Sequence, residues 1–106
     1  MDPVPAQVSV TVSRSSGSPR ICVAGEIDQL GAAVLRDALD RVAAEHPGRV
    51  DVDLADVTFF DCAGVSALLA AEQAAGGRLV LVAAAPAVRK VLRVLNLAAM
   101  FDPTPP

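Results

Sequence analysis

The chain has almost no aromatic side chains, with three Phe, no Trp and no Tyr among its 106 residues. Hydrophobic residues nevertheless make up 53% of it, so the core must be built from Ala, Val and Leu, which suits helices packed on a sheet. A single domain of this length buries an adequate core without covalent staples. We expect one domain over residues 1–106, with an ordered core at about 6–101 and a frayed tail at 102–106.

Positive charge and long apolar runs are also scarce. Nine Lys and Arg residues stand against twelve Asp and Glu, a net charge of −3, which argues against a nucleic-acid partner. No uncharged apolar run reaches the roughly 18 residues that a membrane span needs, so we expect no direct membrane insertion. The first residues lack the basic and apolar regions of a signal peptide, which predicts a cytoplasmic protein.

Cysteine and histidine are equally rare. Cys22 and Cys62 are the two cysteines, and His46 is the single histidine. Because a cytoplasmic compartment is reducing, a structural disulfide is not the default. One imidazole and no Cys-x-x-Cys leave no recognisable metal site, so we predict no metal and no other cofactor, with His46 a solvated bystander.

Hydrophobic periodicity predicts four strands. Residues 7–13 alternate, with Val8, Val10 and Val12 on one face, and residues 20–24 form a second strand that pairs with the first as a hairpin. Further strands are expected at 50–54 and 78–82. In the third strand Asp51 and Asp53 alternate with apolar residues, so one face of the sheet need not be covered by helices.

Three apolar stripes with helical spacing predict three helices. The first follows a capping Asp28 and stops at residues 46–48, the second follows a capping Asp61 and stops at Gly76-Gly77, and the third begins with Pro86. Residues 97–101 are expected to form a short turn or docking segment. The predicted stripes are Leu30, Val34, Leu35, Ala38, Leu39 and Val42; Gly64, Val65, Leu68, Leu69, Ala71 and Ala75; and Val88, Val91, Leu92 and Leu95.

The order is therefore ββαβαβα, an α/β fold. A hairpin followed by right-handed crossovers gives a mixed sheet. The most specific segment, residues 52–69, reads as a strand, the turn Asp61-Cys62-Ala63-Gly64 and the start of a helix. We expect the free N–H groups of residues 63–65 to point outward at this positive helix end, where anions are favoured. Of Phe59 and Phe60, one ring should close the core, and an exposed ring would serve as a partner anchor.

Four segments in order resemble the STAS domain family: Gly25-Glu26-Ile27-Asp28, residues 53–64, residues 85–92 and residues 95–101. The resemblance implies a STAS-like mixed four- to five-stranded sheet with helices packed mainly on one face. It implies a non-catalytic anti-sigma factor antagonist, a monomer or weak dimer, which binds an anti-sigma factor of the serine-kinase ATPase type and frees a sigma factor. The alternative is a regulatory STAS subunit of a lipid-transport ATPase or signalling complex.

The resemblance also implies a site. Family members usually carry Asp-Ser-Ser-Gly or Asp-Ser-Thr-Gly at the turn, and the hydroxyl directly after the Asp is phosphorylated. Here Cys62 and Ala63 replace both hydroxyls, so no phosphorylation is expected at Cys62. The residues expected to bind the partner are Glu26, Asp28, Phe60, Asp61, Cys62, Ala63, Gly64, Val65 and Ser66.

Several side chains keep alternative interpretations. Cys62 is an unreactive small residue, a redox-sensitive thiol favoured as thiolate by the helix end, or a disulfide partner of Cys22, which requires Cα atoms within about 7 Å. An enzyme is not expected, since no general base is evident near Cys62. Glu26, Asp28 and Asp61 either hold Mg²⁺ or simply cap helices and face water. Ser66 is either an ordinary helix residue or a displaced phosphate acceptor.

Overall fold

The computed structural model describes residues 7–15 and 17–97, and the order of its elements is the predicted one. Strands β2 (Ser18–Ile27) and β3 (Val50–Phe60) extend beyond the predicted residues 20–24 and 50–54, because β-bulges in their pairing interrupt the alternation without ending the ladder. Most of the predicted segment 97–101 and the tail at 102–106 lie outside the described residues. The elements are β1 (Val8–Ser15), β2 (Ser18–Ile27), α1 (Gln29–Glu45), β3 (Val50–Phe60), α2 (Cys62–Ala74), β4 (Leu79–Ala84) and α3 (Pro86–Val94).

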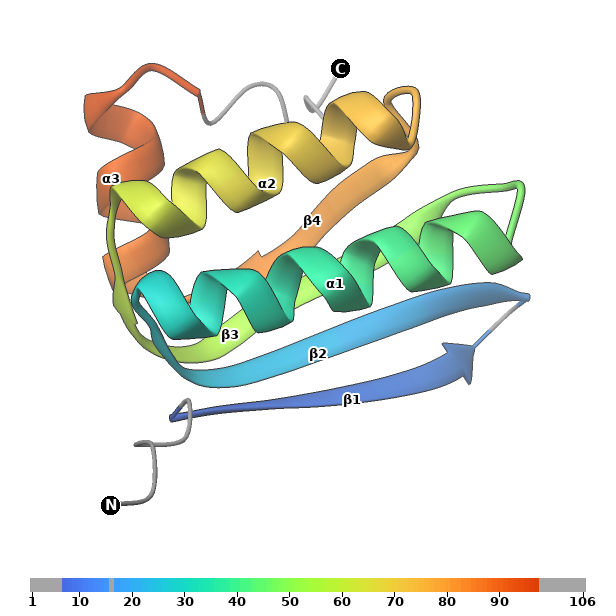
Figure 1. The fold of residues 1–106 in the computed structure, drawn as a ribbon, viewed down its shortest axis with the longest axis horizontal. Coiled ribbons are helices and arrows are strands. Elements are labelled where there is room, and N and C mark those ends of the chain that lie inside the picture. Colours follow the sequence, from blue (N-terminus) through green and yellow to red (C-terminus); the bar gives the residue numbers. More distant parts are fainter. Residues whose placement is uncertain (1–6, 16, 98–106) are drawn as a thin grey trace.

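The four strands form one mixed sheet in the order β1-β2-β3-β4. β1 runs antiparallel to β2, whereas β2, β3 and β4 are parallel. The two parallel crossovers step in the same direction across the sheet, so the usual right-handed connection puts both helices on the same face. Figure 1 shows α1 and α2 side by side over the sheet, with α3 at the end where β3 stops. The predicted fold class is therefore confirmed.

The core lies between the sheet and the two long helices. Full burial of one large aliphatic side chain contributes about 1.5–3 kcal/mol, so these residues supply much of the driving force for folding. Within residues 7–15 and 17–97, no helix combines the length and the apolar character needed to cross a bilayer. The most deeply buried core side chains are Ile21, Val23, Ile27, Leu35, Leu39, Val50, Val52, Leu54, Leu68, Val88 and Leu92.

The predicted stripe of α1 is wrong at its N-terminal end. Leu30 and Val34 are 52% and 38% exposed, whereas Gly31 and Ala32 are buried in their place. Gly31 packs so tightly that an added Cβ would lie 2.3 Å from the carbonyl oxygen of Glu26. This close approach of α1 to the end of β2 rotates the helix and turns Leu30 toward solvent.

The sheet face turned away from the helices is polar, as the alternation of Asp51 and Asp53 predicted. Arg20 donates a hydrogen bond of 2.7 Å to Asp53, and Arg49 donates one of 2.6 Å to Asp51. Burial by itself raises the pKa of Asp53, but the hydrogen bonds from Arg20 and from the Ala55 N–H outweigh it and hold that pKa below its ordinary value. This face therefore carries two charge pairs at its solvent boundary.

Arg78 joins the end of α1 to the start of β4. Its guanidinium donates to the carbonyls of Ala43, His46 and Gly48 at 3.0, 2.6 and 2.7 Å. The Ala43 and His46 oxygens lie at the negative end of α1, where the helix leaves carbonyls without internal partners, and the Gly48 oxygen lies in the loop that follows. One side chain therefore caps a helix that has no basic residue in its own last turn.

We expect Arg78→Met to lower the free energy of unfolding by about 1–3 kcal/mol, because three carbonyls lose a charged donor. Arg78→Lys should have a free energy of unfolding between those of the unmodified protein and Arg78→Met, since an ammonium group cannot reproduce the planar fork of the guanidinium. Urea denaturation measures both, with Arg41→Met on the exposed face of α1 as the matched control. Equal midpoints for Arg78→Met and Arg41→Met would contradict this role.

Candidate functional site

The ends of β2 and β3 bring the predicted site together. In the parallel register Glu26 lies opposite Phe59 and Ile27 lies opposite Phe60. Asp28 follows Ile27 and Asp61 follows Phe60, and each is the N-cap of the helix that comes next. Two segments more than thirty positions apart in the sequence thus form one end of the molecule.

Both aspartates cap the helices that follow them, as predicted. Asp28 Oδ1 accepts a hydrogen bond of 2.9 Å from the Gly31 N–H, and Asp61 Oδ1 accepts one of 3.0 Å from the Ala63 N–H. The Val65 N–H donates to the Asp61 carbonyl at 3.1 Å. The expectation of free N–H groups is therefore wrong for Ala63 and Val65. At the start of α2, the side chain of Asp61 accepts from the first of these groups and its backbone carbonyl accepts from the second.

Cys62 is the first residue of α2, and its side chain is exposed. Both cysteines are free, which contradicts the alternative of a disulfide. The reason is that Cys22 lies in the middle of β2, with its Sγ 3.9 Å from Asp53 Oδ2, whereas Cys62 lies beyond the end of β3. Ser66 is exposed one turn farther along α2.

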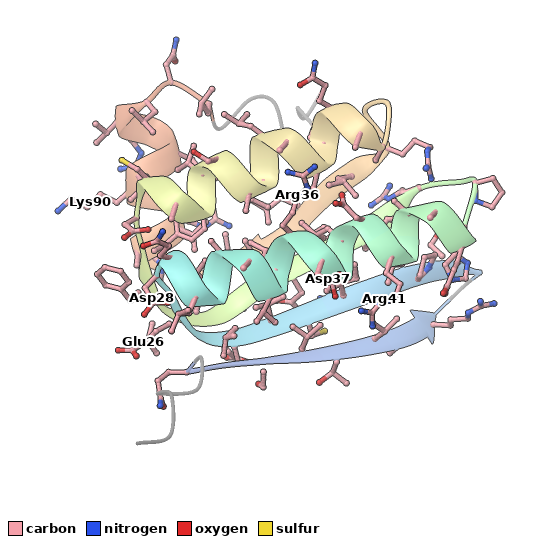
Figure 2. The ribbon with its side chains drawn as sticks, in the orientation of Figure 1. Glu26, Asp28, Arg36, Asp37, Arg41 and Lys90 are labelled. Atoms are coloured by element: carbon pink, nitrogen blue, oxygen red, sulfur yellow. The ribbon has the colours of Figure 1, made fainter. Side chains whose placement is uncertain are left out.

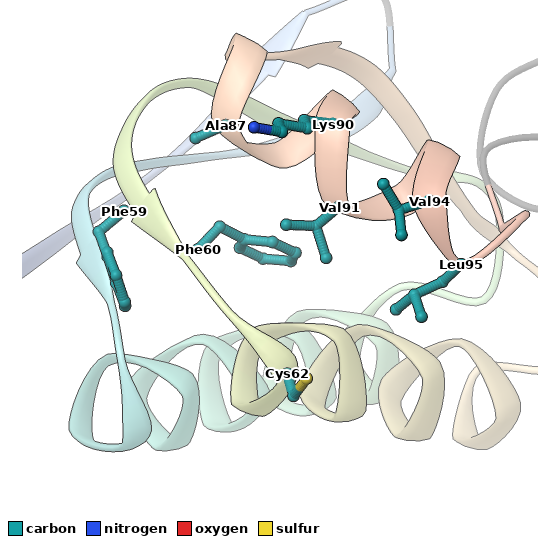
Figure 3. Close-up of a pocket in the computed structure, with 8 residues that line it drawn as sticks. All are labelled: Phe59, Phe60, Cys62, Ala87, Lys90, Val91, Val94 and Leu95. Carbon is teal, nitrogen blue, oxygen red and sulfur yellow. The ribbon is translucent and has the colours of Figure 1, made fainter.

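The two phenylalanines before the turn point to opposite sides of the end of β3 (Figure 3). Phe59 is 45% exposed, and Phe60 is 5% exposed. The ring of Phe60 packs against Gly64, where an added Cβ would lie 2.5 Å from the ring carbon Cε1. Phe60 therefore closes the core, and Phe59, which the predicted set omitted, presents the exposed ring.

The residues predicted to bind a partner differ in what they present to solvent. Their role in binding stays a prediction, but burial separates those that can contact a partner from those that position them. Glu26, Cys62 and Ser66 are exposed; Asp28, Asp61 and Ala63 are half-buried; Phe60, Gly64 and Val65 are buried.

A hollow of about 430 Å³ lies between the end of β3 and α3, and we call it the α3 groove (Figure 3). The sequence prediction missed it, because α3 was expected to bury its whole stripe. Leu95 on that stripe is instead 46% exposed, and Val94 beside it is 75% exposed. The available signal was Val94, an apolar residue off the predicted stripe. The groove is lined by Phe59, Phe60 and Cys62 on one side and by Ala87, Lys90, Val91, Val94 and Leu95 on the other.

Charge is divided across this end of the molecule. Figure 2 shows Glu26 and Asp28 at the same end as Lys90, which belongs to α3. Together with Asp61, the two acidic residues form what we call the acidic rim.

Over the described ranges, no three or more His, Cys, Asp or Glu side chains are grouped so that they could hold a metal ion.

Comparison with known protein families and curated proteins gives consistent matches. A family model described as "Mlab, STAS domain" matches residues 10–102. The anti-sigma-F factor antagonist RsfB of Mycobacterium tuberculosis is 33% identical over 72 residues, which cover 68% of this chain. The matched region spans only 59% of the length of that relative.

Solved structures show the same architecture. An anti-sigma factor antagonist from Mycobacterium paratuberculosis superposes with a TM-score of 0.81 at 29% identity, covering 95% of this chain and 92% of that one. The anti-sigma factor antagonist SpoIIAA in its unphosphorylated form superposes with a TM-score of 0.71 at 20% identity, covering 91% and 89%. The second likeness supports the fold alone.

We expect Gly64→Ala to lower the free energy of unfolding by about 1–3 kcal/mol, because the new methyl group collides with the Phe60 ring. Thermal or urea unfolding measures this change. Gly48→Ala is the matched control, since an added Cβ there meets no atom within 4 Å. Combining Gly64→Ala with Phe60→Leu should recover part of the loss in a double-mutant cycle. A Gly64→Ala variant as stable as the unmodified protein would show that the contact does not constrain α2.

Proposed function

This chain belongs to the STAS domain family, and we propose that it acts as an anti-sigma factor antagonist. In this proposal it binds an anti-sigma factor of the serine-kinase ATPase type and frees the sigma factor which that protein would otherwise hold. The likeness to a mycobacterial antagonist over nearly the whole chain is the observation that carries the proposal. The protein contributes a surface and no catalytic step.

The proposed binding surface is the turn after β3 together with the acidic rim. Cys62 and Ser66 present their side chains to solvent, and Glu26 is exposed beside them at the end of β2. Phe60 and Gly64 lie beneath and hold the start of α2 at a fixed angle. A rigid surface of this kind suits partner exchange, because little conformational entropy is lost when the partner binds.

Phosphorylation is not proposed as the switch. A serine or threonine kinase transfers phosphate to a hydroxyl oxygen, and residues 61–64 offer none. A thiol stands at the position where the family carries the acceptor. Control of this antagonist would then come from oxidation of the exposed Cys62, from Ser66, or from competition and expression level.

A second candidate function is a regulatory subunit of a lipid-transport ATPase or a signalling complex. The observation that favours it is the same turn, because a module that is not switched by phosphorylation needs no hydroxyl at position 62. Identification of the partner captured from the native cytoplasm separates the two. An ATPase of the serine-kinase type supports the antagonist, and a transport ATPase supports the alternative.

Cys62→Asp should weaken binding to the anti-sigma factor by about tenfold or more, which corresponds to at least about 1.4 kcal/mol. The reason is that a carboxylate would be desolvated beside Asp61 within the interface. The dissociation constant is measured by titration calorimetry. Gln73→Glu, which adds the same charge at the far exposed end of α2, is the control. Affinity unchanged by Cys62→Asp would count against this surface.

Incubation with the cognate kinase and ATP should leave the intact mass of the protein unchanged, whereas Cys62→Ser should gain one phosphate on the new hydroxyl. Ala63→Ser tests whether the kinase requires the position directly after Asp61. Mass spectrometry of peptides locates any modification. Stoichiometric phosphate on Ser66 would show that the acceptor has moved by one helical turn, and phosphate on Cys62 would contradict the proposal that this position is not a switch.

A further inference from the structure

We propose that the α3 groove receives an amphipathic helix of the anti-sigma factor, whose apolar side chains fill the groove and whose flank carries a carboxylate opposite Lys90. This inference rests on the proposed function and extends the partner surface beyond the turn and the acidic rim. It assigns α3 a share in recognition.

The apolar character of the groove is the first observation. Phe59, Val94 and Leu95 are large side chains that remain about half exposed or more around one hollow. Isolated exposed apolar residues are ordinary on protein surfaces, but a contiguous set around a cavity marks an interaction site.

The scarcity of polar groups in the groove favours a helix over an extended segment as its occupant. Of its lining side chains, only Lys90 and Cys62 are polar, and the other six are apolar. An extended peptide would bury backbone N–H and C=O groups against this apolar lining and leave them unpaired. A helix satisfies its own backbone groups and presents apolar side chains on one face, which is the usual way in which such a groove is filled.

Charge gives the partner an orientation. Lys90 stands on the α3 side, and the ion pairs recorded in residues 7–15 and 17–97 do not include it. The acidic rim of Glu26, Asp28 and Asp61 stands at the ends of β2 and β3. A partner helix that places a carboxylate over Lys90 and basic residues toward the rim meets opposite charge on both sides.

The groove is continuous with the proposed binding surface through Cys62. This residue begins α2 at the turn and also lines the groove. A partner seated on the turn therefore covers the mouth of the groove without a separate interface. The reactivity of Cys62 consequently reports whether a partner covers the junction of the turn and the groove. Cys22, on the polar face of the sheet, is a control within the same molecule.

Alkylation with iodoacetamide, followed by peptide mass spectrometry, measures whether a partner covers Cys62, where the turn meets the groove. With the purified anti-sigma factor present at ten times its dissociation constant, we expect the alkylation rate of Cys62 to fall about tenfold by mass action, and that of Cys22 to stay unchanged. Slow alkylation of Cys62 in the free protein would show that the groove is already filled, by a second copy or by residues 98–106, and would overturn the proposal.

Two pairs of variants then separate the groove from the turn. Val94→Glu places a charge in the apolar groove and should weaken binding about tenfold or more, whereas Val12→Glu, at another exposed valine on β1, should not. Lys90→Glu should weaken binding more than Arg93→Glu, which makes the same charge change on the same helix outside the groove lining. Since Val94 is largely exposed, these changes leave the core intact, and thermal unfolding verifies it.

The outcomes distinguish this inference from the proposed function. If Cys62→Asp weakens binding while Val94→Glu and Lys90→Glu bind as their controls do, the groove is not used and the inference is overturned, but the antagonist surface at the turn stands. If the unmodified protein binds no anti-sigma factor, both are overturned. If Val94→Glu and Lys90→Glu lose binding while their controls, Val12→Glu and Arg93→Glu, bind as the unmodified protein does, the helix in the groove is supported.

Discussion

The ring of Phe60 rests on the bare Cα of Gly64, and the angle between β3 and α2 depends on this contact. Because glycine has no Cβ, the ring packs directly against the first turn of the helix. Because Phe60 is buried, its neighbour Phe59 points outward. Cys62, the first residue of α2, is exposed to solvent. One aromatic–glycine contact therefore sets both the candidate binding surface and one wall of the α3 groove.

The parallel register of β2 and β3 supplies the second half of the site. Two capping aspartates come to the same end because parallel strands end at the same edge of the sheet. Each carboxylate is engaged by its helix, Asp28 with Gly31 and Asp61 with Ala63, which favours a structural role and an acidic rim over a metal site. The rim and Lys90 then make the surface bipolar, a property that favours orientation of a partner more than raw affinity.

The turn after β3 carries a thiol at residue 62 on a capped helix start. The cap, the glycine and the first turn of α2 are in place around Cys62. For the proposed antagonist, such a turn is compatible with a protein that is always competent to bind, or with control through the redox state of the exposed thiol. A fold shared by several kinds of assembly does not decide between them, and the identity of the partner does.

Local sequence signals were enough to predict the order of the elements, the capping roles of Asp28 and Asp61, and the end of α2 just before Gly76-Gly77, because these features depend on neighbours within a few residues. Periodicity failed where distant backbone approaches closely: the packing of Gly31 on Glu26 turned Leu30 outward. Which phenylalanine is exposed, and that α3 faces Cys62 across a groove, could not be predicted from the sequence, because residues 59–62 and 87–95 come together only through the last crossover of the fold.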